Sequence, residues 1–382
     1  MVNTPEELGS WLRLSLTSGV GNDTARKLLA AFGEPAQIFA QSESTLRQVV
    51  SATQARHLTT TPEGWAELTQ DTWAWLQSHE NSGVACAVLT LGDADYPAPL
   101  LLIPDPPLML YALGQTGALA QLKAESSLAM VGSRNPTPQG QANAREFARA
   151  LAGSGLTIVS GMALGIDGAA HDGALLGAAP QALATIAVVG TGLDRVYPRQ
   201  HRELAHRIAQ RGLILSEYHL GTPPLNANFP KRNRLIAGLS QATLVVEAAL
   251  QSGSLITAKQ ALEQGRDVLA IPGSIHSAQA KGCHALIKQG AKLVESAQDV
   301  LEELRMPDPL AQVPLALDAA AAPVEAEDEL LSLMGHDPVG LDALQARCGW
   351  PTAQLQAQLL ELELMGQVGR LPGGLFQRIG KA

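Results

Sequence analysis

The amino-acid sequence predicts an α/β fold in which helices cover both faces of a doubly wound, mostly parallel β-sheet. From about residue 125 onwards, short runs that are apolar throughout alternate with amphipathic stretches. Strands that are apolar on both faces and separated by helices are typical of buried parallel sheets. The 382 residues are 46% hydrophobic but only 4% aromatic and include 36 glycines, which favours closely packed layers of Ala, Val, Leu and Ile.

The strands and helices of this region predict a Rossmann-like core over residues 83–305. The strands are expected at Ser127–Val131, Leu156–Ser160, Thr185–Val189, Leu213–Ser216, Thr243–Glu247, Val268–Ile271 and Lys292–Val294. The helices between them are expected near 139–152, 168–177, 200–211, 232–239, 255–265 and 282–289. In such a sheet a ligand binds at the carboxyl ends of the strands.

A helical domain of the SAM or helix-hairpin-helix type is expected over residues 1–82. Leucine-rich spacing predicts its helices at 8–16, 24–32, 44–50 and 65–78. The segment Thr17–Leu29 resembles a helix-hairpin-helix, whose glycine turn exposes N–H groups that can hold a phosphate. An ordinary corner between two helices is an equally good interpretation, because residues 1–122 carry 12 acidic side chains against 5 basic ones.

A linker rich in proline and alanine is expected at residues 306–324, and a winged-helix domain at residues 325–382. Helices are predicted at 328–334, 341–347 and 352–365, followed by a two-stranded wing. The last of these helices, which would be the recognition helix, contains no Lys or Arg and carries Glu361 and Glu363. Because these carboxylates would repel phosphates in a DNA groove, we predict that this domain contacts protein instead.

The net charge of −9 conceals a basic central region. Residues 123–300 carry 17 basic side chains against 12 acidic ones, whereas residues 301–382 carry 5 against 12. Within the central region one cluster contains Arg195, Arg199, Arg202, Arg207, Arg211, Lys231, Arg232 and Arg234. An anionic ligand is therefore expected in this region.

Other features argue against several protein classes. The acidic N-terminus and the lack of any apolar run near ~20 residues indicate a protein that is neither exported nor membrane-bound. The three cysteines are far apart, which argues against a disulfide framework or a zinc site and favours the cytoplasm. The sequence has no Walker, His-Glu-x-x-His or Gly-x-Ser-x-Gly motif, and its Gly190-Thr191-Gly192 turn lacks the third glycine of a dinucleotide fingerprint. No cofactor and no metal are expected.

Two glycine-rich turns follow predicted strands and are expected to form an anion-binding site. They contain Gly132, Ser133 and Arg134 in the first turn and Ser160, Gly161 and Gly165 in the second. Gly132 allows the backbone to approach a ligand closely, and Arg134 offers a planar fork of donors that matches a phosphate. Both turns lie at the carboxyl ends of parallel strands, so their N–H groups point at one crevice.

The segment Asn228–Ser240 combines an aromatic side chain with cations at a predicted helix start. Cations that neutralise phosphates and an aromatic ring that stacks on a base are the two requirements of single-strand binding. The candidates are Phe229, Lys231, Arg232, Asn233 and Arg234, together with Ser252, Gly253 and Ser254 of a later polar loop. A solvated basic helix terminus is the alternative, although cations at a helix N-terminus are unfavourable without an anion.

Four other polar residues have two interpretations each. Asp167, Glu217 and Glu247 could serve as acid or base, but no partner that would fix a reaction is found, and roles in holding loops or caps are favoured. His171 lies four residues after Asp167 and could be a ligand or a base. A structural histidine is the favoured interpretation.

Taken together, these motifs strongly resemble the DNA-processing protein A family (DprA, also called Smf). The resemblance covers roughly residues 85–300 and includes the glycine turns, the Phe229–Arg234 segment and the run from Pro272 to Ala291. It implies a protein of the bacterial cytoplasm that binds single-stranded DNA without catalysis. It also implies a homodimer through the Rossmann-like core and a role in loading RecA recombinase onto incoming strands during natural transformation.

The resemblance further implies a DNA pocket lined by Ser133, Arg134, Ser160, Gly161, Lys231 and Arg232. Leu164 stands where many relatives have Arg, and His284 where they often have Asn, so a pocket with one cation fewer is expected. An enzyme is the alternative, namely a nucleotide-cleaving phosphoribohydrolase of the LOG type that uses Glu247 and Arg134. In this chain, however, the Ser252–Ser254 loop follows the glutamate instead of preceding it.

Overall fold

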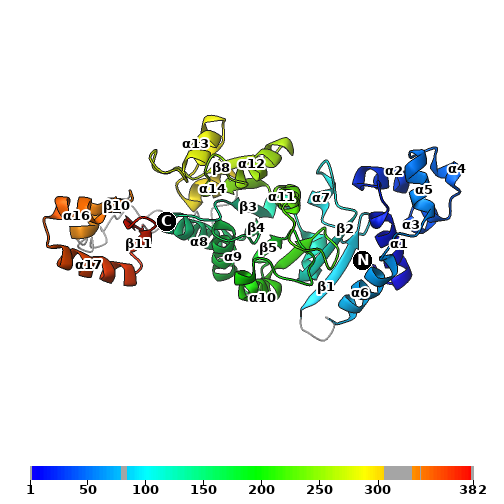
Figure 1. Ribbon diagram of the computed structural model, residues 1–382, viewed down its shortest axis with the longest axis horizontal. Coiled ribbons are helices and arrows are strands. Elements are labelled where there is room, and N and C mark those ends of the chain that lie inside the picture. Colours follow the sequence, from blue (N-terminus) through cyan, green and yellow to red (C-terminus); the bar gives the residue numbers. More distant parts are fainter. Residues whose placement is uncertain (1, 79–83, 305–328, 336, 380–382) are drawn as a thin grey trace, which may run out of the picture.

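The computed structural model describes residues 2–78, 84–304, 329–335 and 337–379, and it has three parts along its long axis (Figure 1). N-terminal helices lie at one end, an α/β part lies in the middle, and a small C-terminal domain lies at the other end. The linker predicted at 306–324 falls outside the described residues. Within the described ranges, no helix is both long and apolar enough to cross a membrane.

The N-terminal part is helical, as predicted. Its helices are α1 (Pro5–Leu16), α2 (Asn22–Phe32), α3 (Pro35–Phe39), α4 (Glu43–Leu46), α5 (Ala52–Thr59) and α6 (Trp65–Ser78). Thr4 caps α1, because its side chain accepts a hydrogen bond from the Glu7 N–H. The apolar core of this part includes four of the five tryptophans of the chain, namely Trp11, Trp65, Trp73 and Trp75.

In the described part of the chain, nine strands form the central sheet in the order β1-β2-β6-β5-β4-β3-β7-β8-β9. They are β1 (Ala85–Thr90), β2 (Met109–Gly114), β3 (Ser127–Val131), β4 (Thr157–Ser160), β5 (Thr185–Val188), β6 (Leu213–Ser216), β7 (Ala242–Val245), β8 (Asp267–Ala270) and β9 (Lys292–Leu293). Strands β3 to β9 run parallel, as predicted. The antiparallel pair β1–β2, which extends the sheet beyond β6, is absent from the sequence prediction.

Helices pack on both faces of this sheet, which confirms the doubly wound architecture. One face carries α8 (Pro138–Gly153), α9 (Ile166–Gly177), α10 (Arg202–Arg211) and α14 (Ala297–Glu303). The other carries α7 (Ala98–Leu101), α11 (Asn228–Gly238), α12 (Ser254–Glu263) and α13 (Lys281–Lys288). Short 3₁₀ helices are η1 (Thr116–Gln121), η2 (Ala124–Ser126) and η3 (Arg199–His201).

Helices α8 and α9 touch each other through their backbones. Gly173 and Gly177 of α9 face the backbone carbonyls of Arg145 and Arg149 on α8, and a Cβ atom at either glycine would overlap these oxygens. Because the two glycines are four residues apart, they lie on the same side of α9. The spacing between the two helices is therefore fixed.

The C-terminal domain is a winged helix, as predicted. It consists of α15 (Glu329–Met334), β10 (Val339–Gly340), α16 (Leu341–Cys348), α17 (Thr352–Leu364), β11 (Val368–Leu371) and β12 (Leu375–Arg378). Its strands pair in the order β10-β12-β11, and Trp350 packs against its apolar core. The backbone of Gly369 lies against Pro138, so the domain contacts the start of α8.

Candidate nucleic-acid interface

A cavity of about 510 Å³, which we call the main cavity, opens where the sheet order changes direction. From β3 the chain continues to β4, β5 and β6 on one side, and it then places β7 on the other side of β3. Loops that leave β3 and β7 therefore diverge at their carboxyl ends. Doubly wound sheets bind their ligands in the crevice that this divergence creates.

Gly132 fixes the shape of the loop that follows β3. A Cβ atom at this position would lie 2.6 Å from Ile166 Cγ1 and 2.9 Å from the Glu247 carbonyl oxygen, so only glycine fits. The Ser133 N–H donates to the same Glu247 oxygen (2.7 Å), and the Ser133 carbonyl accepts from the Ile166 N–H (3.1 Å). The fixed backbone presents the exposed Arg134 side chain to the main cavity.

Phe229 and Arg134 form one wall of the main cavity. The Arg134 guanidinium carbon lies 5.5 Å from the centroid of the Phe229 ring. The centroids of the Tyr197 and Phe229 rings are 5.6 Å apart. On the other side of this wall is a smaller cavity of about 70 Å³, which Gly161 and Gly190 help to line. Aromatic rings beside a guanidinium provide a surface on which a base can stack next to a cation for its phosphate.

Arg232 is a buried cation that lines both cavities. The residue is 4% exposed, and its guanidinium donates hydrogen bonds to the carbonyls of Gly161 and Val188. Burial lowers its pKa to about 10, with Asp167 opposing and Arg134 adding to this change. Among the described residues, Arg232 forms no ion pair with a carboxylate. A buried positive charge without a paired carboxylate suits an anionic ligand.

Asp167 also lines the main cavity, but it is engaged with the backbone. Its Oδ2 accepts a hydrogen bond from the Ala163 N–H (3.2 Å), and the residue is 7% exposed at the start of α9. Burial raises its pKa, an effect that Arg232 opposes. This geometry agrees with the favoured interpretation that Asp167 holds a loop.

The α11 side chains that line the main cavity share one face of the helix. They are Phe229, Arg232, Asn233 and Ile236, at the spacing i, i+3, i+4 and i+7. Lys231 and Arg234 lie on other faces and line neither cavity. Lys231 is half-exposed, with its Nζ 3.9 Å from Glu217 Oε2. Helical spacing in the sequence is the signal that could have shown that Lys231 and Arg234 lie on other faces of the helix than Arg232.

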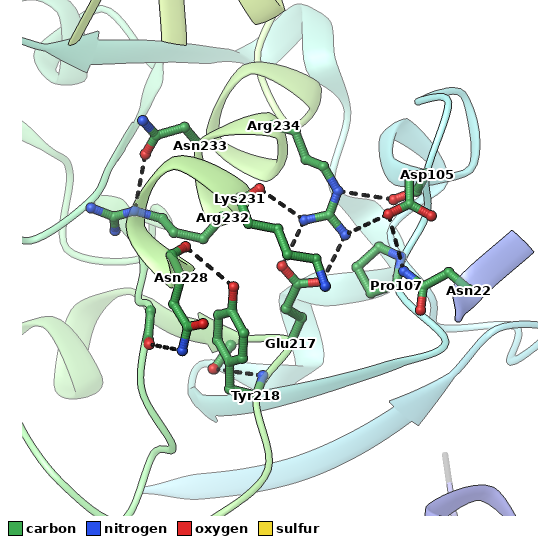
Figure 2. A network of polar contacts seen from close by, with 12 residues as sticks. Asn22, Asp105, Pro107, Glu217, Tyr218, Asn228, Lys231, Arg232, Asn233 and Arg234 are labelled. Atoms are coloured by element: carbon green, nitrogen blue, oxygen red, sulfur yellow. Dashed lines mark hydrogen bonds and ion pairs between the residues drawn. The ribbon is translucent and has the colours of Figure 1, made fainter. Parts of the chain in front are cut away.

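Arg234, predicted as a DNA contact, is instead held by carboxylate and carbonyl oxygens (Figure 2). Its Nη1 and Nη2 donate to the two Glu217 oxygens at 2.6 and 2.7 Å, and its Nε donates to the Asp105 carbonyl at 3.1 Å. The Arg234 and Glu217 side chains are 11% and 5% exposed. The Asp105 carboxylate also accepts hydrogen bonds from Asn22 and Arg26 of α2. The network therefore joins the helical part to α11.

Most of the other predicted residues lie around the main cavity: Gly132, Ser133, Ser252, Gly253 and Ser254 line it. Gly161 lines the smaller cavity. Gly165, with a φ of 81°, precedes α9, and a Cβ atom there would meet the Ser133 backbone. Ser160 is fully buried, and its hydroxyl donates to the Met130 carbonyl (2.7 Å). The structure therefore puts the Ser160 side chain inside the sheet and not in the cavity.

Sequence reasoning missed several polar side chains of the main cavity, which are Asn135, Asn226, Gln251, Thr257 and Gln279. Amide side chains directly after a predicted strand were the available signal for Asn135 and Gln251. Asn226 and Gln279 come from longer loops that fold back onto the cavity. The Gln279 Nε2 donates to the Asn135 carbonyl (3.2 Å), so this hydrogen bond joins two loops at the edge of the main cavity.

Glu247 and His171 have structural roles, as the sequence interpretation favours. Glu247 accepts hydrogen bonds from the Thr137 N–H (2.9 Å) and hydroxyl (2.6 Å) at the start of α8, and burial raises its pKa. His171 is fully buried with its Nδ1 2.7 Å from Thr185 Oγ1, and burial lowers its pKa to about 3. Neither side chain lines the main cavity.

Comparison with known protein families shows to which family the chain belongs. The family model described as DNA recombination-mediator protein A matches residues 87–305, which is more than half of the chain. The chain belongs to the DNA recombination-mediator protein A family. A second model, the DprA winged helix domain, matches residues 314–374. The resemblance inferred from the motifs is confirmed.

Individual members of this recombination-mediator family align with much of the chain. Protein Smf of Escherichia coli (strain K12) is 42% identical over 294 residues, which are 75% of this chain and 76% of that protein. DNA processing protein DprA of Streptococcus pneumoniae is 47% identical over 211 residues, which are 55% of this chain and 72% of that protein.

Two solved structures of the same family have similar folds. DNA processing protein A from Streptococcus pneumoniae has a TM-score of 0.64 and 36% identity, and the match covers 79% of this chain and 99% of that one. DNA processing protein A from Helicobacter pylori, whose structure describes its single-stranded DNA binding mode, has a TM-score of 0.51 and 32% identity, with 57% and 95% covered. All residues of the main cavity lie inside the segment that the family model matches.

Proposed function

We propose that this protein binds single-stranded DNA in the main cavity, catalyses no reaction on it, and helps to load RecA recombinase onto the bound strand in the bacterial cytoplasm. One observation carries the proposal: within the described residues, the buried Arg232 has no paired carboxylate, and it lines a cavity beside Arg134 and Phe229. A phosphate would supply the opposite charge. The family membership and the binding mode of the Helicobacter pylori relative support this choice of ligand.

In this proposal, phosphates and bases use different walls of the main cavity. The guanidinium groups of Arg134 and the buried Arg232 attract phosphate oxygens, while the Phe229 ring stacks on a base. Stacking and charge do not distinguish one base from another, so we expect binding with little sequence preference. Leu164, at a position where the resemblance implies Arg in many relatives, is 39% exposed, lines the smaller cavity and adds an apolar contact there.

The proposal that the protein is not an enzyme rests on how its carboxylates are used. Base release by a phosphoribohydrolase would need a carboxylate that faces the sugar, whereas Asp167, the carboxylate in the lining of the main cavity, accepts a hydrogen bond from the Ala163 N–H and holds a loop. Glu247, the residue assigned to that role in the alternative, accepts hydrogen bonds from the Thr137 N–H and hydroxyl and does not line the main cavity. Release of a base from a nucleoside monophosphate, abolished by Glu247→Gln, would restore the enzyme hypothesis.

The proposed partners are RecA and a second copy of this chain, and the match to a recombination-mediator family supports the first of these. We expect the homodimer to form through the α/β part. Outside the main cavity, large apolar side chains are exposed on α12 and in the loops that follow β7 and β8, namely Leu262, Leu250 and Ile275. We expect contact with a partner on this side, because apolar side chains that are exposed in the free protein become buried in an interface.

A titration tests the proposed function. Anisotropy of a labelled oligo-dT, compared with a duplex of equal length at two salt concentrations, should show tighter binding of the single strand. Its log–log salt slope should be about −0.7 per neutralised phosphate. Arg134→Ala should weaken binding about tenfold, the value of one strong charge-assisted contact, without changing the Tm.

Arg47→Ala, which removes an exposed ion pair with Glu43 in the helical part, is the control and should leave the affinity unchanged. Binding that is independent of salt, or an equal effect of Arg134→Ala and Arg47→Ala, would contradict the proposal.

A further inference from the structure

A second cleft, of about 810 Å³, lies between α8, α9 and α10 and is bordered by Gly366 and Ile379 of the winged helix. Arg145 of α8, Arg207 of α10 and His201 line it, together with Asp172 of α9. We propose that this cleft is a second track for the phosphodiester backbone of the single strand, which leaves the main cavity past Arg134. The inference rests on the proposed function and extends it, because it assigns a ligand to residues outside the main cavity.

Shared residues connect the second cleft to the two other cavities. Arg134 lines all three, and Asn135 lines both the main cavity and the second cleft. Leu164 lines the smaller cavity and the second cleft. A flexible chain held by Arg134 can therefore continue into the second cleft without crossing a separate part of the surface.

The charge of the second cleft suits a polyanion. Arg145 Nη2 lies 3.1 Å from Asp172 Oδ2, and Arg207 Nη2 donates to Asp172 Oδ1, so a single carboxylate compensates two guanidinium groups. Glu146, the other acidic residue of the lining, pairs with Arg149 (3.2 Å). The two cations beside Asp172 therefore keep a net positive charge.

The arginines of the second cleft are available to a ligand while their ion pairs stay intact. The Arg145 and Arg207 side chains are 49% and 44% exposed, whereas Asp172 between them is 25% exposed. Each guanidinium has five donors, and each of these two ion pairs uses one terminal nitrogen. The remaining N–H groups can bind phosphate oxygens with the planar geometry that arginine favours.

The backbone under these arginines is held firmly. The Arg145 carbonyl touches Gly173 on α9, one residue after Asp172, so the approach of α8 and α9 fixes the distance between Arg145 and Asp172. Arg207 belongs to the arginine-rich segment at residues 195–211. No residue of this basic segment lines the main cavity. Cations on fixed helices bind a phosphate with less loss of conformational entropy than cations on loops.

The experiment compares two oligo-dT lengths on the full chain. A strand of about 4 nucleotides can occupy the main cavity alone, whereas one of about 16 nucleotides can also reach the second cleft, within the range of single-strand sites on one domain. The double variant Arg145→Ala, Arg207→Ala should bind the longer strand about tenfold more weakly and lower its salt slope by about 1.4, for two lost phosphate contacts. The loss should be confined to the longer strand.

Asp172→Asn provides a test that misfolding cannot imitate. It removes the carboxylate between the two arginines, so the longer strand should bind several-fold more tightly, with a steeper salt dependence. Arg47→Ala, which removes an exposed ion pair with Glu43 in the helical part and lies outside the lining of the cleft, is the control and should leave both affinities unchanged.

The outcomes separate this inference from the proposed function. Weaker binding of both lengths in Arg134→Ala supports the main cavity in either case. If the double variant and Asp172→Asn leave the affinity for the longer strand unchanged, or alter both lengths equally, the second track is refuted while the main cavity stands. If the wild-type protein binds neither strand in a salt-dependent way, the proposed function itself is refuted.

Discussion

Arg232 and Arg234 are two residues apart on α11, yet their surroundings give them different roles. Arg232 is buried against the carbonyls of Gly161 and Val188 and faces both cavities. Arg234 is paired with the Glu217 carboxylate on another side of the helix. Carbonyl partners leave a guanidinium with its full net charge, whereas a carboxylate neutralises it. In the sequence both are cations of one basic run, and only their neighbours distinguish them.

Arg234→Met should destabilise the protein strongly. It leaves the buried Glu217 carboxylate with only the half-exposed Lys231 ammonium, 3.9 Å away, and breaking a buried ion pair in this way costs about 3–5 kcal/mol. Urea unfolding measures the change. Lys259→Ala, which removes an exposed pair with Glu263, is the control and should cost less than about 1 kcal/mol. Similar small losses in both variants would show that the network does not stabilise α11.

Burial of His171 should make the protein less stable in acid. Its folded-state pKa is lowered to about 3 from the ordinary value of 6.5, so below pH 6.5 the unfolded chain binds a proton that the folded chain does not. The free energy of unfolding should therefore fall by about 1.4 kcal/mol per pH unit from this group as the pH decreases from 6.5 towards 3.

Urea unfolding at several pH values between 7 and about 4.5 measures this slope. His171→Asn should lower it by about 1.4 kcal/mol per pH unit, which is the contribution of one proton. His219, whose pKa burial lowers to about 4, contributes in the same direction and persists in the variant. Identical slopes for the variant and the wild type would contradict this prediction.

At the scale of elements, local patterns predicted the parallel strands well, and Ser127–Val131 and Leu213–Ser216 have the predicted bounds. The pair β1–β2 was missed because the proline-rich stretch from Pro97 to Pro107 interrupts the alternation of strands and helices. Helix α11 begins at Asn228, four residues earlier than predicted, because Pro230 is compatible with the first turn of a helix. No local pattern shows that Asn226 and Gln279 fold back onto the cavity.

Gly173→Ala should destabilise the packing of α8 on α9. The added methyl group would overlap the Arg145 backbone carbonyl, which cannot move aside as a side chain would, and overpacking of this kind costs about 1–3 kcal/mol. Thermal unfolding measures the change. Gly117→Ala in η1, where the added methyl group meets open space, is the control and should stay within about 0.5 kcal/mol. Equal Tm values for the two variants would mean that the close approach of the helices is not required.

At the scale of the whole molecule, polar contacts tie the N-terminal helices to the α/β part. Asp105 accepts hydrogen bonds from Asn22 and Arg26 of α2 and also lies beside Arg234. His219 lies within hydrogen-bond distance of Ser15 on α1 (3.1 Å). Because the loop with His219 leads into α11, both contacts support the helix that carries the candidate site.

Asp105→Ala should loosen α2 while the sheet stays folded. Asn22 and Arg26 would lose their side-chain acceptor in the α/β part, so the amide protons of α2 should exchange faster with solvent. Hydrogen exchange read by mass spectrometry should show no change in β4 and β5. Glu43→Ala, which removes an exposed ion pair in α4, is the control. Unchanged exchange in α2 would mean that apolar packing alone holds the helical part in place.

The tryptophans lie entirely in the two flanking parts, four among the N-terminal helices and Trp350 in the winged helix. Intrinsic indole emission therefore reports on these two parts and on one edge of the sheet, where the Trp75 ring lies 6.3 Å from the Tyr111 ring of β2 between centroids. A strand confined to the main cavity, whose lining residues all belong to the α/β part, would leave the emission spectrum of the protein unchanged. Quenching on addition of DNA would mean that one of the flanking parts touches the strand or has moved. One emission spectrum therefore distinguishes binding in the main cavity alone from binding that also involves the flanking parts.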